Sequence, residues 1–212
     1  MTTRCVLLAP LVCAVAAFAQ NPITADAPFQ VSYAANPAAG ESYINIINTG
    51  ASGASLQGPG FGATAGNICV NVYTFDPDEE EISCCSCLIT PNSVANLGVN
   101  RDLTANTVTS LIPTSVVIKL VATLAGGDGT GTSCSNSAAT ASTLATGMVA
   151  YGTTPQNVGF SYKVVEHVFV PSTLSAGERA SITGRCAAIL GNASGFGVCT
   201  SCKSGALGAA KQ

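Results

Sequence analysis

Apolar and polar residues alternate in the stretch that follows an apolar leader at the N-terminus. From Ile23 onward one face carries apolar side chains, while the residues between them are mostly polar. A period of two over this length is typical of an extended strand with one buried face. Pro28 has no N–H to donate to a ladder, so we expect this strand to lie at a sheet edge or to be interrupted there. Its apolar face consists of Ile23, Ala25, Ala27, Phe29, Val31 and Tyr33.

Further apolar runs rich in β-branched residues predict the remaining strands, and turns of glycine, proline, asparagine and aspartate separate them. The acidic turn 76–81 joins two of these runs and therefore predicts a β-hairpin. Residues 93–112 follow no single period and predict no definite element. The predicted strands are 42–48, 68–75, 82–90, 115–124, 144–151 and 160–170.

The period changes near the C-terminus. Ser175 and Glu178 have the spacing of a capping box, and the apolar residues after them recur at helical spacing. We therefore predict a helix over 178–190. Many short strands with a single helix indicate a mainly β fold, an Ig-like or jelly-roll β-sandwich stabilised by disulfides. We expect an N-terminal extended strand and one C-terminal helix packed across an edge or an end of the sandwich.

This pattern predicts that the chain is divided into four regions. We expect residues 1–19 to be a signal peptide and residues 20–40 to be an extended arm and hinge, which is a candidate donor strand. Residues 41–173 form the sandwich, and residues 174–212 form the C-terminal helix and a tail held by cysteines.

The leader predicts secretion. An apolar run over 5–18 is shorter than the roughly 20 residues that span a bilayer, and Ala17-Phe18-Ala19 matches the pattern read by a signal peptidase. A lipid-modified Cys13 is an alternative, although no small residue directly precedes it; an uncleaved anchor is another, although the run is short. We expect a secreted or cell-surface protein without a membrane span once the signal is removed.

Low charge narrows the range of partners. The chain has 212 residues and a formal net charge of −3, and only 9% of its residues are charged, against about 25% in typical soluble domains. Weak acidity is unfavourable for binding nucleic acid. A surface this poor in charge needs another source of solubility: neighbouring subunits, covalent glycan, or a surface of serine, threonine and asparagine. Asn192 begins the sequon Asn-Ala-Ser and is a candidate for glycosylation.

The cysteines predict disulfides. Signal removal leaves an even number, and export favours oxidation. Cys85 and Cys87 share one face of a predicted strand, while Cys84 points to the other. A zinc site on this cluster or on Cys199-x-x-Cys202 is an alternative, but no histidine is near either group. A redox pair at Cys199-x-x-Cys202 is another, but no βαβ pattern surrounds it. Four disulfides are expected, with no pairing preferred, among Cys69, Cys84, Cys85, Cys87, Cys134, Cys186, Cys199 and Cys202.

The sequence contains no recognisable catalytic motif, so we expect neither an enzyme nor a cofactor. His167 is the only histidine, and its neighbour Glu166 points to the opposite face of the predicted strand. A serine hydrolase would need His167 as its base, and no GxSxG serine is present. The acidic turn lacks EF-hand spacing, so we expect a solvated turn rather than a calcium site.

Three stretches, residues 76–92, 101–123 and 174–202, resemble a family of uncharacterised exported bacterial proteins. The distinctive part is the run Cys84-Cys85-Ser86-Cys87 followed by Thr90-Pro91-Asn92. This resemblance covers most of the mature chain and implies no activity. Separately, the layout of an extended arm followed by a β domain resembles pilins that polymerise by donor-strand insertion.

The leading hypothesis is therefore a structural subunit of an extracellular or cell-surface filament. Its N-terminal strand would insert into a groove of the next copy, so that the partners are copies of the same chain in a head-to-tail polymer. The simpler interpretation is that this strand belongs to its own sandwich. The alternative function is a secreted monomeric module that binds carbohydrate or a surface protein. A secreted hydrolase with an acidic pair in a cleft is a third class.

Overall fold

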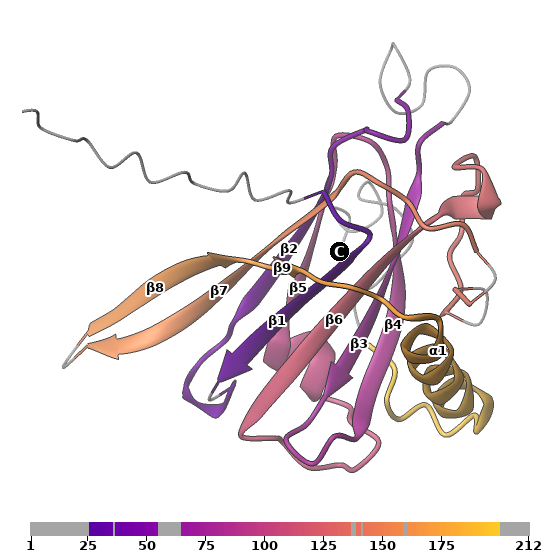
Figure 1. Cartoon of the computed structure of the whole chain (residues 1–212). Helices are drawn as coiled ribbons and strands as arrows, with labels where there is room; N and C mark the ends of the chain where they lie inside the picture. The colour runs from indigo at the N-terminus through magenta and orange to yellow at the C-terminus, as the bar shows by residue number, and fades with distance from the viewer. Residues whose placement is uncertain are drawn as a thin grey trace, which may run out of the picture.

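Two antiparallel sheets and one C-terminal helix make up the computed structural model (Figure 1), which confirms the predicted mainly β class. The predicted signal peptide, Ile23, Ala25 and Cys202 lie outside the residues that the structure describes. Within the described residues, no helix is both long and apolar enough to cross a membrane. The described residues are 26–35, 37–54, 65–136, 139–140, 142–158 and 161–199.

One sheet has five strands in the order β4-β3-β6-β1-β9, and the other has four in the order β5-β2-β7-β8. The strands are β1 Phe29–Ala35, β2 Tyr43–Asn48, β3 Ile68–Phe75, β4 Glu81–Ile89, β5 Val94–Gly98, β6 Ser115–Leu124, β7 Met148–Val158, β8 Ser161–Val168 and β9 Val170–Pro171. The helical elements are the short η1 Pro37–Ala39, the π-helix η2 Val99–Thr104, the 3-10 turn η3 Ala125–Gly127 and the α-helix α1 Ala176–Gly191.

The main core lies between the two sheets. Strands β3, β4 and β6 pair side by side in antiparallel register, so their alternate residues form one continuous inner face. Removing one such side chain from water stabilises the fold by about 1.5–3 kcal/mol. The central residues of this core are at most 1% exposed; they are Ile44, Ile46, Val70, Val72, Ile118 and Leu120.

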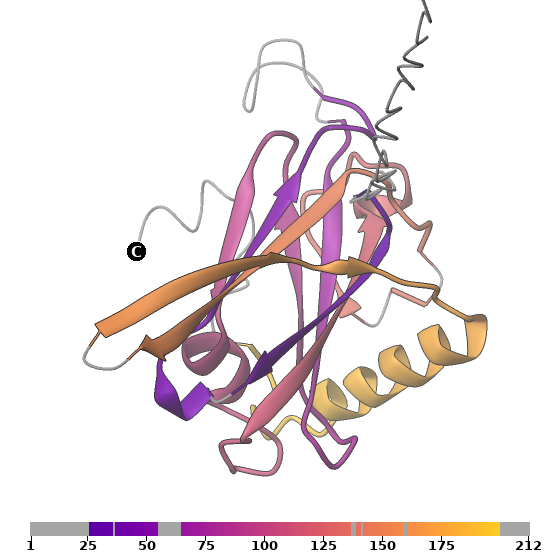
Figure 2. The same ribbon diagram turned by 60° about the vertical axis from the view of Figure 1, so that its left-hand side comes forward.

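A second core lies on the outer face of the five-stranded sheet, under helix α1 (Figures 1 and 2). The helix therefore covers a face of the sheet, whereas we had expected it at an edge or an end. Alternate residues of β1, β3 and β6, with Cys84 of β4, supply the sheet side of this layer, because side chains alternate between faces. Its buried members are Phe29, Tyr73, Phe75, Cys84, Val121, Ile182, Cys186 and Ile189.

Strand β1 belongs to this chain's own sheet. It begins directly after Pro28, pairs along its whole length with β6, and pairs with β9 only at Gln30 and Val31. Its apolar face, with Phe29 and Val31, points to the helix layer rather than into the sandwich. Ala34 is the β1 residue that joins the inner core.

Two late strands differ from the prediction. Strand β7 begins at Met148 rather than at residue 144, because Leu144 makes only an isolated bridge and Gly147, with φ of +93°, breaks the extended run. The predicted strand 160–170 divides at the buried Phe169. Its first part, β8, pairs with β7 in one sheet, and its last part, β9, pairs with β1 in the other.

Helix α1 begins at Ala176, directly after the predicted cap residue Ser175 and before the predicted start at residue 178. The hydroxyl of Ser175 accepts a hydrogen bond from the backbone N–H of Glu178 at 3.0 Å. The carboxylate of Glu178 binds Lys119 on β6 rather than the cap residue, so one half of the capping box is formed. Residues 93–112, for which the sequence predicted no definite element, contain β5 and η2.

Candidate functional site

An open groove of about 560 Å³ lies where β1 and the β8–β9 segment diverge. Because β9 pairs with β1 only at Gln30 and Val31, the rest of β1 has no ladder partner on that side. The groove is largely apolar and includes the only histidine of the chain. Its lining consists of Val31, Ser32, Tyr33, His167, Val168, Val170 and Ser172.

Ser32 and His167 meet in this groove. The hydroxyl of Ser32 lies 2.9 Å from Nε2 of His167, a contact that links the two sheets. The two residues are 135 positions apart, so no local pattern predicted it. Gly152, opposite His167 in the ladder, makes room for the ring, since a Cβ there would lie 2.3 Å from Nε2. A glycine inside a strand often marks a place where another group approaches the backbone closely. Gly152 is therefore the one sequence signal that could have indicated a side chain lying across β7 here.

A serine bonded to a histidine has the geometry of a nucleophile and its base. Acyl transfer also needs a group that orients the other ring nitrogen and donors for the oxyanion. In the part of the chain that the structure describes, no side chain is hydrogen-bonded to Nδ1 of His167. The pair can therefore join the sheets and offer a polar contact at the base of the groove.

The free edge of β8 borders the groove. Strand β8 ends its sheet, and the β7–β8 hairpin stands out from the body of the molecule in both ribbon views (Figures 1 and 2). Exposed apolar side chains lie on β8, on β9 and on the groove rim, and we call the strand edge together with these residues the β8 edge. The exposed fractions are 58% for Tyr33, 70% for Val164, 40% for Val165 and 64% for Val170.

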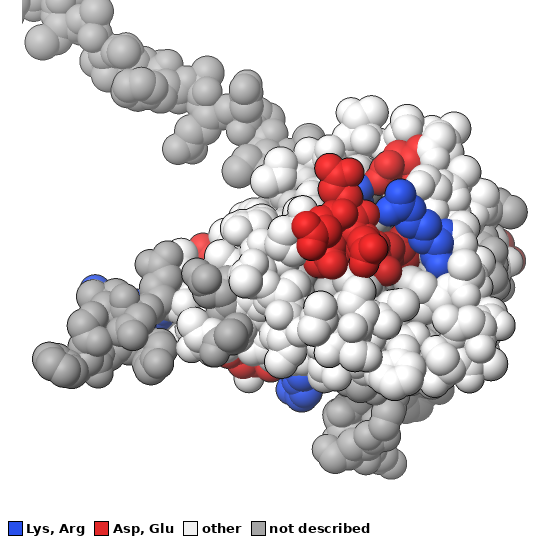
Figure 3. Space-filling view, turned by 90° about the horizontal axis from the view of Figure 1, so that it is seen from below, with Lys and Arg blue, Asp and Glu red and all other residues white. Residues whose placement is uncertain are grey.

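Charged side chains gather on the helix-covered face of the five-stranded sheet, near the β3–β4 hairpin, where acidic and basic groups lie side by side (Figure 3). Lys119 lies 2.5 Å from the Glu178 carboxylate and 4.5 Å above the ring of Phe75. Arg185 stands over the same ring and donates to the backbone carbonyl of Glu79 at 3.0 Å. These contacts fix α1 against the β3–β4 hairpin.

The acidic turn is held by its own hydrogen bonds. The carboxylate of Asp76 accepts from the backbone N–H groups of Asp78 and Glu80, each at 3.0 Å. Residues 78–80 are exposed, as expected for a solvated turn. The turn needs no bound ion to close, because its first residue caps it.

Glu81 differs from the rest of the acidic run. A bulge between Thr74 and Phe75 inserts one extra residue, so Glu81 pairs with Phe75 and points under the helix. Only 7% of it is exposed, and neither carboxylate oxygen has a hydrogen-bond partner. Burial, the largest cause, raises the pKa of this carboxyl to about 8, although the positive charges of Arg185 and Lys119 oppose the shift. We had grouped Glu81 with the solvated turn, and that placement is wrong.

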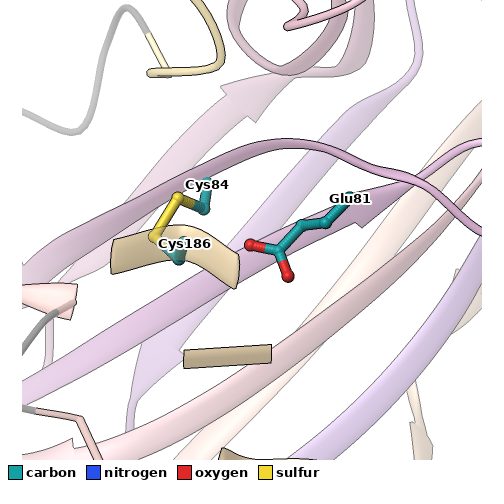
Figure 4. A group of neighbouring side chains, drawn as sticks. All are labelled: Glu81, Cys84 and Cys186. Atoms are coloured by element: carbon teal, nitrogen blue, oxygen red, sulfur yellow. A yellow bond between two sulfur atoms is a disulfide. The ribbon is translucent and has the colours of Figure 1, made fainter. Parts of the chain in front are cut away.

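The carboxyl of Glu81 points at a disulfide (Figure 4). One ligand atom from each of Glu81, Cys84 and Cys186 lies within 4.8 Å of the others, and all three residues are buried. Tyr73 stands opposite Cys84 in the ladder, and its hydroxyl is likewise buried without a partner. Burial raises the pKa of Tyr73 as well.

The predicted disulfides form among the described cysteines. Cys69 pairs with Cys134, Cys84 with Cys186 and Cys85 with Cys199. Cys87 is also disulfide-bonded. The predicted faces are confirmed, because Cys85 and Cys87 lie in the inner core and Cys84 lies under the helix. Several disulfides in one domain indicate an oxidising environment outside the cytoplasm.

The remaining predicted residues are dispersed. Of the candidate donor-strand contacts, Phe29 is buried, Val31 is half-buried beneath α1 and Tyr33 is exposed at the groove; Ala27 precedes the strand. Asn192 caps the C-terminus of α1 and is exposed, so its sequon is accessible.

Comparison with known proteins found no matching family model, no matching curated protein and no matching solved structure.

Proposed function

We propose that this protein is an exported structural subunit that associates with copies of itself through the β8 edge. The observation that carries the proposal is a strand of eight residues, Ser161–Val168, that ends its sheet beside exposed apolar side chains. Main-chain groups on such an edge bind a second strand, and the apolar neighbours become buried when it arrives.

Both edges of the five-stranded sheet are less accessible. Backbone hydrogen bonds join Cys84 on β4 to Gly197 and Cys199, so the tail covers that edge of the five-stranded sheet. Its opposite edge, β9, has only two residues. The low charge of the whole chain also favours a surface that a second copy covers.

Antiparallel pairing of two β8 edges would join two four-stranded sheets across a twofold axis. The same surface then serves both copies, and the contact closes as a dimer. A filament requires a second, head-to-tail contact.

The position of β1 favours donor-strand exchange as that second contact. It is the first strand of the described chain, forms seven register pairs with β6 but only two with β9, and leads into the turn at Pro37–Ala39. If this turn opened, β1 of one copy would occupy the same slot in the next, with Phe29 and Val31 under the neighbour's helix. Repeated exchange gives an open polymer with each joint a completed sheet.

Sedimentation velocity of the purified oxidised protein tests the β8 contact. We expect the wild type to sediment as a dimer or larger species and Val164→Lys to sediment as a monomer, because a second lysine beside the exposed Lys163 adds repulsion between the paired strands and removes an apolar contact. Ile112→Lys is the matched control, since Ile112 is 69% exposed and Val164 is 70% exposed. A wild type that stays monomeric at high concentration would contradict the proposal and favour the monomeric binding module, for which glycan arrays are the next measurement.

Negative-stain electron microscopy of material from the native cell surface tests strand exchange. We expect thin fibres of uniform width from the wild type and none from Phe29→Asp, because a carboxylate cannot enter the apolar slot. Leu111→Asp, at a residue that is 70% exposed, is the control and should leave the fibres unchanged. Mass-spectrometric mapping checks that the disulfides remain. Normal fibres from Phe29→Asp would refute donor-strand exchange and leave the β8 contact untouched.

A further inference from the structure

The cluster of Glu81, Cys84 and Cys186 contains three side chains that can bind a metal ion, and only two of them take part in the disulfide. A disulfide satisfies its two sulfur atoms, but the neighbouring carboxylate remains buried with no hydrogen bond. Buried polar groups are paired in the great majority of cases, and an exception calls for an explanation such as a redox role or a bound ion.

We propose that reduction of the Cys84–Cys186 disulfide creates a buried site for a thiophilic divalent cation, with Zn²⁺ as the expected ion and Glu81 as the third ligand. A dithiol reductant supplies two electrons and two protons: its own sulfurs become a disulfide, and Cys84 and Cys186 become thiols. Binding of the cation then releases the two thiol protons and the proton that the buried Glu81 carboxyl holds, so that two thiolates and one carboxylate bind the metal.

The ligand set suits this ion. Zn²⁺ binds cysteine sulfur at about 2.3 Å and carboxylate oxygen at about 2.0–2.2 Å. The three ligand atoms already lie within 4.8 Å of one another, so side-chain rotation can bring them around one ion. Three protein ligands leave one position of a tetrahedron, and the partnerless hydroxyl of Tyr73 stands on the same face, opposite Cys84.

The surroundings compensate the charge of the site. Two thiolates and a carboxylate around Zn²⁺ leave one net negative charge, and Lys119 and Arg185 both act electrostatically on Glu81. Cys84 comes from β4 and Cys186 from α1, so a bound ion would hold the helix on the sheet as the disulfide does. The reduced protein would then keep its second core.

This site is separate from the zinc alternative that the cysteine spacing suggested. Cys85 and Cys87 point into the inner core, on the other face of β4. Cys84 cannot share a metal with them without a change of register, because its side chain faces the helix.

Cobalt titration of the reduced full-length protein tests the proposal. The reductant is a phosphine, because dithiols chelate metals. We expect one tight Co²⁺ site with thiolate charge-transfer absorption, and X-ray absorption of the Zn²⁺ form showing two sulfur ligands and two light-atom ligands. Glu81→Gln should weaken Co²⁺ binding by about tenfold or more. Cys69→Ser/Cys134→Ser, which removes a different disulfide, should leave the site unchanged.

Three results would overturn the proposal: no thiolate absorption, a metal with four sulfur ligands, or equal affinity in the wild type and Glu81→Gln. Circular dichroism of each reduced variant separates loss of the site from loss of the fold. If Glu81→Gln binds weakly while unfolded, Glu81→Asp is the second variant, and its failure to bind Co²⁺ better than Cys84→Ser would equally reject Glu81 as a ligand.

Discussion

Glu81 shows how one residue can depart from the pattern around it. In the sequence it closes a run of acidic residues that reads as a solvated turn, and its neighbours are indeed exposed. A single bulge in the β3–β4 hairpin turns it inward, where it lies beside Cys84 and Cys186. The period of apolar residues does not reveal where a strand contains a bulge, so the inward position of Glu81 could not be predicted from the sequence.

The oxidised protein should lose stability as the pH rises because of this residue. The folded state holds the Glu81 proton up to a pKa of about 8, whereas the unfolded chain releases it near 4.5. The unfolded state therefore binds fewer protons between these values, and the free energy of unfolding falls as the pH increases through this range. Below the lower value both states are protonated and the effect vanishes.

Urea unfolding at pH 4, 6 and 8.5 measures this effect. Glu81→Gln should match the wild type at pH 4 and become the more stable of the two as the pH rises. Glu79→Gln, in the exposed turn, serves as the control and should follow the wild type. An identical pH dependence for Glu81→Gln and the wild type would show that the carboxyl is not buried as described.

At the scale of elements, the sequence predicted strands best where a regular period met β-branched residues. The limits of β6, Ser115–Leu124, match the prediction at both ends, and the hairpin around the acidic turn is confirmed. The alternation in β1 correctly marked a buried face, but only the tertiary structure shows that this face packs under α1. The division of one run into β8 and β9 was missed because a strand that changes sheets keeps its local apolar pattern.

Helix α1 carries an avoidable weakness at Gly184. This residue is exposed in the helix interior, and a Cβ there would meet no atom within 4 Å. Gly184→Ala should therefore stabilise the protein by about 0.5–1 kcal/mol, since alanine loses less backbone entropy in a helix. Thermal unfolding measures the gain, and Gly126→Ala, at φ of +69°, is expected to destabilise. No gain for Gly184→Ala would mean that α1 does not limit stability.

The whole molecule has three layers, and one of the described disulfides joins two of them. Cys84–Cys186 joins the five-stranded sheet to α1, while Cys69–Cys134 joins the same sheet to the loop after η3. The sequence predicted which cysteines would be bonded, but pairings that span 65 to 114 residues depend on the fold and could not be read locally. The same limit applies to Ser32 and His167.

Removal of the helix disulfide should loosen one layer selectively. Cys84→Ser/Cys186→Ser is expected to cost about 2–4 kcal/mol of stability, because the bond closes a long loop in the unfolded chain. Hydrogen exchange should show loss of protection in α1, with the strands of the other sheet retained. Cys69→Ser/Cys134→Ser is the matched control and should leave α1 protected; equal protection of α1 in both variants would contradict the role of Cys84–Cys186 as its staple.

The bond between Cys85 and Cys199 also decides how the molecule responds to tension. A pull applied between residue 26 and residue 199 passes through this bond and bypasses everything between its two ends. Only residues 26–85 can lengthen, and at about 3.3–3.6 Å per residue they limit the extension to roughly 200 Å. Strands β5 to β9 and helix α1 carry no load along the backbone, so the chain that forms them is not stretched while β1, β2 and β3 are drawn out.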